Sequence, residues 1–246
     1  MIATEKTWGI SGNALKLLAA ALMTVDHIGL IFFPRVLAWR IIGRLSMPIF
    51  AFMVAQGCKY TRSRLKYLGN LFACLALCQI PYYVAYQRTE ICILGTFFVG
   101  ATLLFCLQDT KKALADGKWL WGIFGVFSFI FGVCLTYLLN KCVSLDYGFW
   151  GCMLPVFAGL LYCPDNAPPL WKKLDNKWTS LLFFGIGLYI LAKDSGASLQ
   201  AYCLFSLGIL ALYSGRRGKG GLKYFFYLFY PLHLALLQGL YLLLHN

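Results

Sequence analysis

Long apolar segments alternate with short polar breaks along the whole of this chain. A window of about 15 to 22 mostly apolar residues is the length that an α-helix needs to cross the hydrocarbon core of a bilayer. Nine such windows lie at 14–33, 41–58, 66–87, 91–107, 119–139, 148–163, 178–192, 199–213 and 223–244. Four of them are short, so at least one is a candidate for a tilted, re-entrant or partly submerged segment. The pattern predicts an all-α, polytopic bundle of about nine transmembrane helices.

The connections between these windows are too short to form a soluble domain. The longest are 108–118 and 164–178, and the second contains the turn residues Pro164, Pro168 and Pro169. No internal repeat of the kind found in many secondary transporters is evident. We therefore expect a single transmembrane domain over residues 1–246.

Basic residues are divided unequally between the two sides that the nine windows define. Sixteen of the 22 Lys and Arg residues lie near the N-terminus or at every second connection. The other six are Arg35, Arg40, Arg44, Arg88, Lys141 and Lys193. Connections rich in Lys and Arg remain in the cytoplasm, so we expect a cytoplasmic N-terminus and a C-terminus outside.

Composition supports the membrane assignment and excludes several classes of function. Hydrophobic residues make up 60% of the chain and charged residues 13%, whereas soluble domains carry about 25% charged residues. The net charge of +13 would suggest nucleic-acid binding in a soluble protein, but here it follows from membrane topology, so we expect no nucleic-acid partner. The ten cysteines have neither metal-ligand nor disulfide spacing, and we expect no metal. Residues 1–13 lack the features of a cleavable signal, so the first window should remain as a helix.

Two charge-capable residues, Asp26 and His27, lie inside the first apolar window. An acid at the centre of a transmembrane helix costs roughly 2.5–3.5 kcal/mol, so its presence needs an explanation. One interpretation is a pair satisfied within the bundle, and the other is a catalytic or substrate-binding histidine. Lys16 lies three helical turns before His27, about 16 Å along the axis, and shares its face. Asp26 lies about 100° round the helix, so it is expected to be turned away from that face.

The second window opens with two arginines, Arg40 and Arg44, on one side of a helix. Both can pair with Asp26, although an interfacial position with the side chain extended toward the headgroups is the simpler interpretation for Arg40. Arg44 is one turn deeper, and both interpretations stay open for it. Pro48 should kink this helix or free a carbonyl group for a polar neighbour.

Three further polar positions occur at or near membrane depth. Gln79, with Tyr82 and Tyr83, is expected to form a hydrogen-bonded structural cluster near the outer interface. Asp146 precedes the sixth window, either as a helix start or in a functional role. His233 follows Pro231 in the last window, and it is either a hydrogen-bonded core residue or functional.

Several short motifs carry a resemblance to a known family, and together they touch most of the chain. They are Asp26-His27-Ile28-Gly29, Ile42 to Phe52, Lys66-Tyr67 with Gln79-Ile80-Pro81, Asp146-Tyr147-Gly148, and Tyr230 to Leu234. Their order resembles the TraX family, membrane acetyltransferases named for acetylation of the pilin N-terminus, and more distantly the acyltransferase family 3 and related transmembrane acyltransferases. Met47 departs from the pattern, because many relatives have an aromatic residue there.

The resemblance implies an enzyme of the bacterial cytoplasmic membrane that transfers an acetyl group from cytoplasmic acetyl-CoA to an envelope-associated acceptor. The acceptor group would be an amine or a hydroxyl. His27 would be the general base, a step worth about 10²–10⁴ in rate. Asp26 would orient it, and Arg44 or His233 would stabilise oxyanion charge or bind the acceptor. The candidates for binding CoA phosphates are Lys16, Lys59, Arg62, Arg64, Lys66, Arg216 and Arg217.

Two other classes of function remain open from the sequence. In a proton-coupled transporter, Asp26, His27 and His233 would form a relay. In a non-catalytic assembly factor, these residues would have structural roles. For many of the basic residues, membrane topology alone is a sufficient explanation.

Overall fold

The computed structural model describes residues 9–86, 90–196, 198–218 and 222–245. Within these ranges the chain forms eleven α-helices, one 3₁₀-helix and no β-strand. The elements are α1 (Gly12–Phe32), α2 (Leu37–Gly43), α3 (Ser46–Tyr60), α4 (Arg64–Tyr86), α5 (Ile93–Ala115), α6 (Trp119–Cys142), α7 (Gly148–Ala158), α8 (Pro169–Leu174), α9 (Lys177–Asp194), η1 (Ser198–Phe205), α10 (Ser206–Ala211) and α11 (Lys223–His245). The all-α prediction is confirmed for this part of the chain.

Five segments of the described chain have the length and composition of membrane-spanning helices. They are α1, the combined segment Leu37–Tyr60, most of α4, α5 and α6. The four other predicted windows fall on α7, α9, η1 with α10, and α11. The apolar stretches Gly148–Ala158, Ser198–Ala211 and Leu228–Leu244 of these elements have fewer than 18 residues, and α9 carries Lys177, Lys193 and Asp194 at its ends. The structure is therefore that of a multi-pass helical membrane protein.

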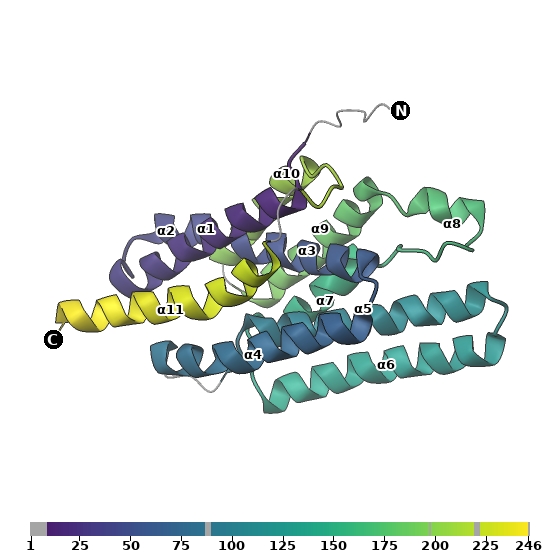
Figure 1. The fold of residues 1–246 in the computed structure, drawn as a ribbon, viewed down its shortest axis with the longest axis horizontal. Coiled ribbons are helices and arrows are strands. Elements are labelled where there is room, and N and C mark those ends of the chain that lie inside the picture. Colours follow the sequence, from purple (N-terminus) through teal and green to yellow (C-terminus); the bar gives the residue numbers. More distant parts are fainter. Residues whose placement is uncertain (1–8, 87–89, 197, 219–221, 246) are drawn as a thin grey trace.

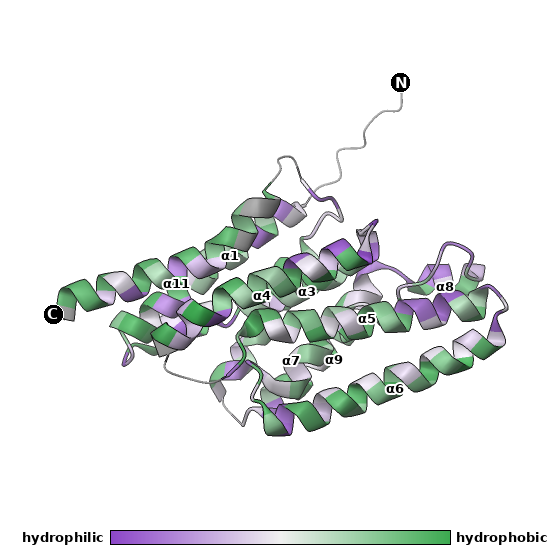
Figure 2. Cartoon of the chain, turned by 60° about the horizontal axis from the view of Figure 1, so that its bottom comes forward, coloured by the Kyte–Doolittle hydropathy of each residue, from purple (hydrophilic) through white to green (hydrophobic). Residues whose placement is uncertain are grey.

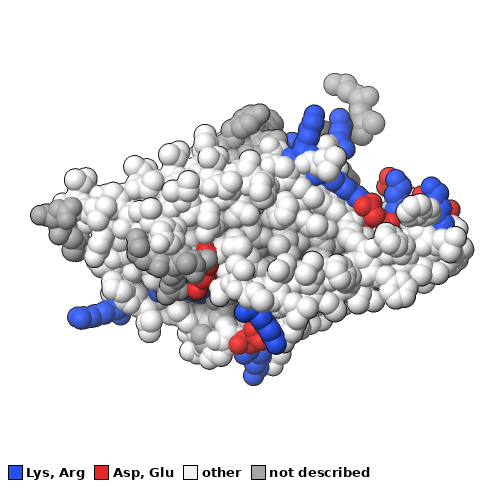
Figure 3. All heavy atoms as spheres, turned by 90° about the horizontal axis from the view of Figure 1, so that it is seen from below, with Lys and Arg blue, Asp and Glu red and all other residues white. Residues whose placement is uncertain are grey.

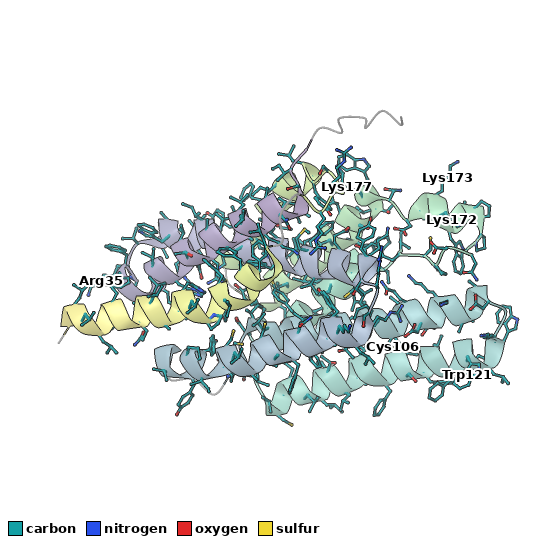
Figure 4. All side chains as sticks on the ribbon, viewed as in Figure 1. Arg35, Cys106, Trp121, Lys172, Lys173 and Lys177 are labelled. Atoms are coloured by element: carbon teal, nitrogen blue, oxygen red, sulfur yellow. The ribbon has the colours of Figure 1, made fainter. Side chains whose placement is uncertain are left out.

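The long helices run along the longest axis of the molecule, and α5 and α6, which are joined by a short connection, are antiparallel (Figure 1). The connection between α5 and α6 lies at the same end as α8, whereas the connection between α1 and α2 lies at the end where α11 finishes (Figure 1). Lys172 and Lys173 are accordingly at one end and Arg35 at the other (Figure 4). The connections that the sequence assigns to opposite sides thus lie at opposite ends.

Helix α6 forms an apolar outer face of the bundle (Figure 2). Its buried residues are Gly122 and Thr136, while Phe124, Phe127 and Phe131 are 65–68% exposed. An apolar face of this extent is suited to lipid rather than to water. In the space-filling view, uncharged atoms cover most of one face and Lys and Arg gather toward its margins (Figure 3).

Helix α3 occupies the centre of the bundle. Its buried residues include Ile49, Ala51, Phe52 and Ala55, each fully enclosed. Phe52 packs edge-on against Phe184 of α9, with ring centroids 5.5 Å apart. The apolar core therefore surrounds α3, and the other helices are arranged around it.

The second predicted window is broken into α2 and α3. Pro48 lies in the first turn of α3, where backbone N–H groups have no partner within the helix, so the missing N–H costs nothing. Its ring, however, would clash with the carbonyl group of the residue four positions earlier if that residue were helical. The chain turns at Arg44 and Leu45, and the Leu45 N–H donates to the Ile42 carbonyl at 3.3 Å. The expected kink is thus a break that begins N-terminal to Pro48, with Arg44 at the bend.

A close contact between α1 and α2 depends on glycine. A Cβ atom at Gly43 would lie 2.2 Å from Asp26 Oδ1, and one at Gly29 would lie 2.3 Å from Trp39 Cβ. The two helices can approach this closely because neither glycine has a side chain. This packing brings α2 against the part of α1 that carries Asp26 and His27.

Candidate functional site

A cavity of about 760 Å³ lies between α1, α3, α4, α5 and α11. Near the connections 61–63 and 215–217 its lining is basic, and farther along it includes Asp26 and His27 of α1. Asp146 and Tyr147, which join α6 to α7, also line it. A pocket of this size is in the range that holds small-molecule ligands and cofactors.

His27 and His233 form a hydrogen-bonded pair. His27 Nδ1 and His233 Nε2 are 2.7 Å apart, and the two rings stack with centroids separated by 4.9 Å. His233 Nδ1 lies 2.9 Å from the carbonyl oxygen of Phe229. His233 is buried, at 6% exposure, while His27 lines the cavity. The sequence indicated His27 and His233 as separate candidates, and the structure shows that they are hydrogen-bonded to each other.

Asp26 pairs with Arg40 rather than with Arg44. Arg40 Nη1 donates to Asp26 Oδ2 at 2.7 Å, and the two side chains are only 19% and 15% exposed. The interpretation of Arg40 as an interfacial side chain extended toward the headgroups was wrong, because the close approach of α2 to α1 supplies a buried carboxylate. Asp26 also lines the cavity, so the expectation that it is turned away from His27's face holds only in part.

Arg44 binds two residues that sequence reasoning did not assign to it. Its Nη1 donates to Tyr147 Oη and to Gln200 Oε1, each at 3.2 Å. Tyr147 has a left-handed backbone conformation, with φ of 62°, which is uncommon for a bulky residue. The sequence signal for this site was Asp146-Tyr147-Gly148, whose Gly148 also has a positive φ of 61°. Gln200 gave no signal.

Asp146 precedes Tyr147 in the connection between α6 and α7 and lies near Arg44. Burial raises the pKa of its carboxyl group to about 7, against the opposing effect of the nearby Arg44 guanidinium. Glu90 and Asp26 reinforce the increase through their negative charges. The backbone carbonyl of Asp146 accepts a hydrogen bond from the Thr96 hydroxyl at 2.6 Å. Asp146 therefore holds a titratable group in the cavity wall.

The predicted phosphate-binding residues separate into two groups. Four of them, Lys16, Arg62, Lys66 and Arg217, line the cavity. Lys59, Arg64 and Arg216 are not part of its lining. Lys59 forms an ion pair with Asp175 at 2.5 Å, and Arg64 forms one with Asp109. Their charges are thus directed to other elements.

Backbone hydrogen bonds fix Arg217 near the start of α1. The N–H groups of Gly12 and Asn13 donate to the carbonyl oxygens of Arg216 and Arg217, at 2.8 and 2.9 Å. These amides would otherwise be unpaired at the helix N-terminus. The contact attaches the connection before α11 to α1, and so places the side chain of Arg217 at the cavity.

Gln79 is hydrogen-bonded to the backbone near the start of α5, whereas the sequence predicted a cluster with the tyrosines of its own helix. Its side-chain amide donates to the Glu90 carbonyl at 2.8 Å, and its Oε1 accepts from the Cys92 N–H at 3.0 Å. Tyr82 on the same helix is buried. The described residues contain no group of three or more His, Cys, Asp or Glu side chains placed to hold a metal ion.

Comparison with known proteins places this arrangement in a family. The family model described as TraX protein matches residues 11–241. The chain is 28% identical to a Dichelobacter nodosus protein described as "Probable fimbrial assembly protein FimC, serogroup H1", over 92% of this chain and 94% of that protein. Over 40 residues, 16% of each chain, it is 55% identical to "Uncharacterized protein RP591" of Rickettsia prowazekii (strain Madrid E). No solved structure matches. The chain belongs to the TraX protein family.

Proposed function

We propose that this protein is an acetyl-CoA-dependent membrane acetyltransferase. The observation that carries the proposal is one cavity whose lining includes both His27 and four basic side chains. CoA has several phosphate groups, which Lys16, Arg62, Lys66 and Arg217 can bind by ion pairing and charge-assisted hydrogen bonds. With the phosphates at this basic end, the acetyl thioester extends into the cavity toward His27. The distant similarity to acyltransferase family 3 belongs to the same proposal.

The proposed reaction moves one acetyl group and one proton. An amine or hydroxyl of the acceptor attacks the thioester carbonyl, the new bond to carbon forms, and the carbon–sulfur bond breaks. His27 accepts the proton of the attacking group and delivers it to the departing CoA sulfur, so that CoA leaves as the thiol. General base catalysis of this kind is typically worth about 10²–10⁴ in rate.

Arg44 acts on the reaction through Tyr147 in this proposal. Tyr147 lines the cavity, and its hydroxyl oxygen accepts a hydrogen bond from Arg44. A phenol that accepts from a guanidinium is a stronger donor, so its O–H can stabilise the negative charge that develops on the thioester oxygen. Asp26 with Arg40 positions α1 against α2, and His233 supports His27.

The proposed orientation has nine crossings, a cytoplasmic N-terminus and a C-terminus outside. Its support is the separation of Lys172 and Lys173 from Arg35 at opposite ends of the molecule (Figure 4), together with the bias of basic residues. Labelling of single cysteines placed in the connection 61–63 should occur only from the cytoplasmic side. Labelling from the outside would overturn the orientation.

The acceptor is proposed to be an envelope-associated molecule. The relative from Dichelobacter nodosus is described as a probable fimbrial assembly protein, which supports a pilin-related process at the cytoplasmic membrane of a bacterium. A pilin N-terminus, a glycan or a small molecule each offers an amine or a hydroxyl of the required chemistry.

The second candidate function is a proton-coupled transporter. The observation that favours it is the 2.7 Å hydrogen bond between His27 and His233, which a proton relay requires. Asp26, the third proposed member of the relay, instead forms an ion pair with Arg40. This pairing favours a fixed charge at Asp26 over one that is repeatedly protonated.

Binding of acetyl-CoA separates the two functions. The purified protein in detergent should be stabilised by acetyl-CoA, with an unfolding temperature that rises with its concentration, because a ligand that binds the folded state stabilises it. Native mass spectrometry should record the added mass of the cofactor. Failure to bind CoA or acetyl-CoA in both measurements would remove the acetyltransferase and leave the transporter.

A further inference from the structure

His27, which lines the cavity, is connected through His233 to a group that can only accept a hydrogen bond. The carbonyl oxygen of Phe229 has no proton, and His233 Nδ1 lies 2.9 Å from it. His233 Nδ1 must therefore be protonated and donate to this oxygen. A neutral imidazole carries one proton, so His233 Nε2 then has the lone pair.

The position of the proton on His27 follows from that on His233. His27 Nδ1 is 2.7 Å from His233 Nε2. Because His233 Nε2 has the lone pair, His27 Nδ1 must carry the proton of this hydrogen bond. With its proton on Nδ1, a neutral His27 has its lone pair on Nε2. The direction of both hydrogen bonds is thus set by one backbone carbonyl.

The opposite arrangement requires a buried cation. If His27 Nδ1 were the acceptor, His233 would have to donate from both nitrogens and would be an imidazolium. His233 is only 6% exposed, and the carboxylate of Asp26, the residue before His27, is already paired with Arg40. An additional positive charge there is unfavourable, because it would also act on His27, which already lies near Arg40 and Arg44.

His233 is also held in place by its neighbours on α11. Its ring stacks on Phe229 at a centroid distance of 4.9 Å and an interplanar angle of 8°. Tyr230 packs against it edge-on at 5.5 Å. The ring is thus immobilised on α11, which packs beside α1 (Figure 1).

We propose that His233 is a positioning residue that fixes the tautomer of His27, with the proton on Nδ1 and the lone pair on Nε2. The catalytic consequence rests on the proposed function: His27 Nε2 is the atom that accepts the acceptor's proton. The tautomer itself does not depend on the reaction. In water an isolated neutral imidazole favours the proton on Nε2, so this arrangement is one that the protein imposes.

Nitrogen NMR of the full-length protein tests the tautomer directly. The chain has three histidines, so a ¹⁵N-histidine-labelled sample in nanodiscs at pH 7.5, with a His245→Gln sample for assignment, gives few signals. We expect protonated Nδ1 and unprotonated Nε2 in both His27 and His233. A His27 ring protonated on Nε2, or a His233 imidazolium, would overturn the inference.

Variants of His233 test its effect on His27. In His233→Ala, the His27 proton should move to Nε2, and acetyl transfer should fall by about 100-fold or more. In His233→Gln, the side-chain oxygen can accept from His27 Nδ1 while the amide donates to Phe229, so the tautomer and most of the transfer should return. A His27 tautomer that is the same in His233→Ala as in the wild type would contradict the proposal.

Failure of the inference and failure of the proposed function give different results. If the NMR tautomers are as expected but no acetyl transfer occurs, the tautomer inference stands and the enzyme proposal fails. If transfer occurs but His27 is protonated on Nε2, the enzyme proposal stands and the role of His233 fails.

Discussion

Arg40 Nη1 donates a hydrogen bond to Asp26 Oδ2 across 2.7 Å, and this ion pair joins α2 to α1 at the depth of His27. Both side chains are largely buried, with exposures of 19% and 15%. Asp26 Oδ1 is buried without a hydrogen-bond partner among the described residues, so Arg40 is the principal compensation for the carboxylate charge.

Arg40→Ala should destabilise the protein by about 3 kcal/mol, because it leaves a buried charge unpaired. The double variant Asp26→Asn/Arg40→Ala should recover part of this loss, because the charge that needs a partner is removed. Unfolding in detergent measures both, with the exposed Arg35→Ala as control. Equal stability of the Arg40 and Arg35 variants would show that the pair contributes little.

Gly43→Ala tests the close approach of α1 and α2. The new Cβ would lie 2.2 Å from Asp26 Oδ1, so the helices must separate, and overpacking of this kind destabilises by about 1–3 kcal/mol. Gly69→Ala is the matched control, since no atom lies within 4 Å of the added Cβ. The same unfolding measurement should give a loss for Gly43→Ala alone. Similar stability of the two variants would mean that α2 is not held against Asp26.

Lys66→Ala and Arg217→Ala should weaken acetyl-CoA binding by about tenfold each. Both side chains line the basic part of the cavity, and a charge-assisted hydrogen bond is worth about 1.5–3 kcal/mol when buried and less near water. Lys112→Ala removes an exposed charge outside the cavity lining and should leave affinity unchanged. Isothermal titration with acetyl-CoA compares the three. Equal affinities would place the cofactor elsewhere.

Asp146 should make stability depend on pH. Its pKa is raised to about 7 in the folded protein, above the unfolded value, so between about pH 4 and 7 the folded state binds the extra proton. Stability from this group therefore falls as pH rises through that window, by up to about 1.4 kcal/mol per pH unit. Above about pH 7 the contribution is constant.

Asp146→Asn should remove this component of the pH dependence. Unfolding temperatures of the wild type and the variant at pH 5 and pH 8 give the comparison, and the variant should gain relative to the wild type at pH 8. The other charged groups that face Asp146, which are Arg44, Glu90 and Asp26, are present in both proteins. Parallel pH profiles would contradict the raised pKa.

Every predicted window falls on one or more helices, but the short helix α8 lies in the connection 164–178, where the hydrophobic pattern predicted none. The break between α2 and α3 was expected from Pro48, as a kink, rather than from the hydrophobic pattern, and Pro48 acts from the first turn of α3. The apolar windows identified Asp26, His27 and His233 as polar groups at membrane depth. Such groups are rare there, so they became candidates for function.

The partners of these groups could not be predicted from spacing. His27 and His233 are 206 positions apart, and only the packing of α1 against α11 brings them together. The contact of Arg44 with Gln200 likewise depends on where η1 lies. Lys59 and Arg64 belong to basic connections like Lys66, yet tertiary contacts with Asp175 and Asp109 direct them elsewhere.

The most direct test of the central claim is acetyl transfer by His27→Ala under conditions where cofactor binding is verified. Purified wild-type protein in nanodiscs should transfer labelled acetyl groups from acetyl-CoA to an amine or hydroxyl acceptor, or hydrolyse acetyl-CoA slowly. His27→Ala should still bind acetyl-CoA and should lose transfer by about 100-fold or more. Transfer at the wild-type rate by a folded, cofactor-binding His27→Ala protein would contradict the account.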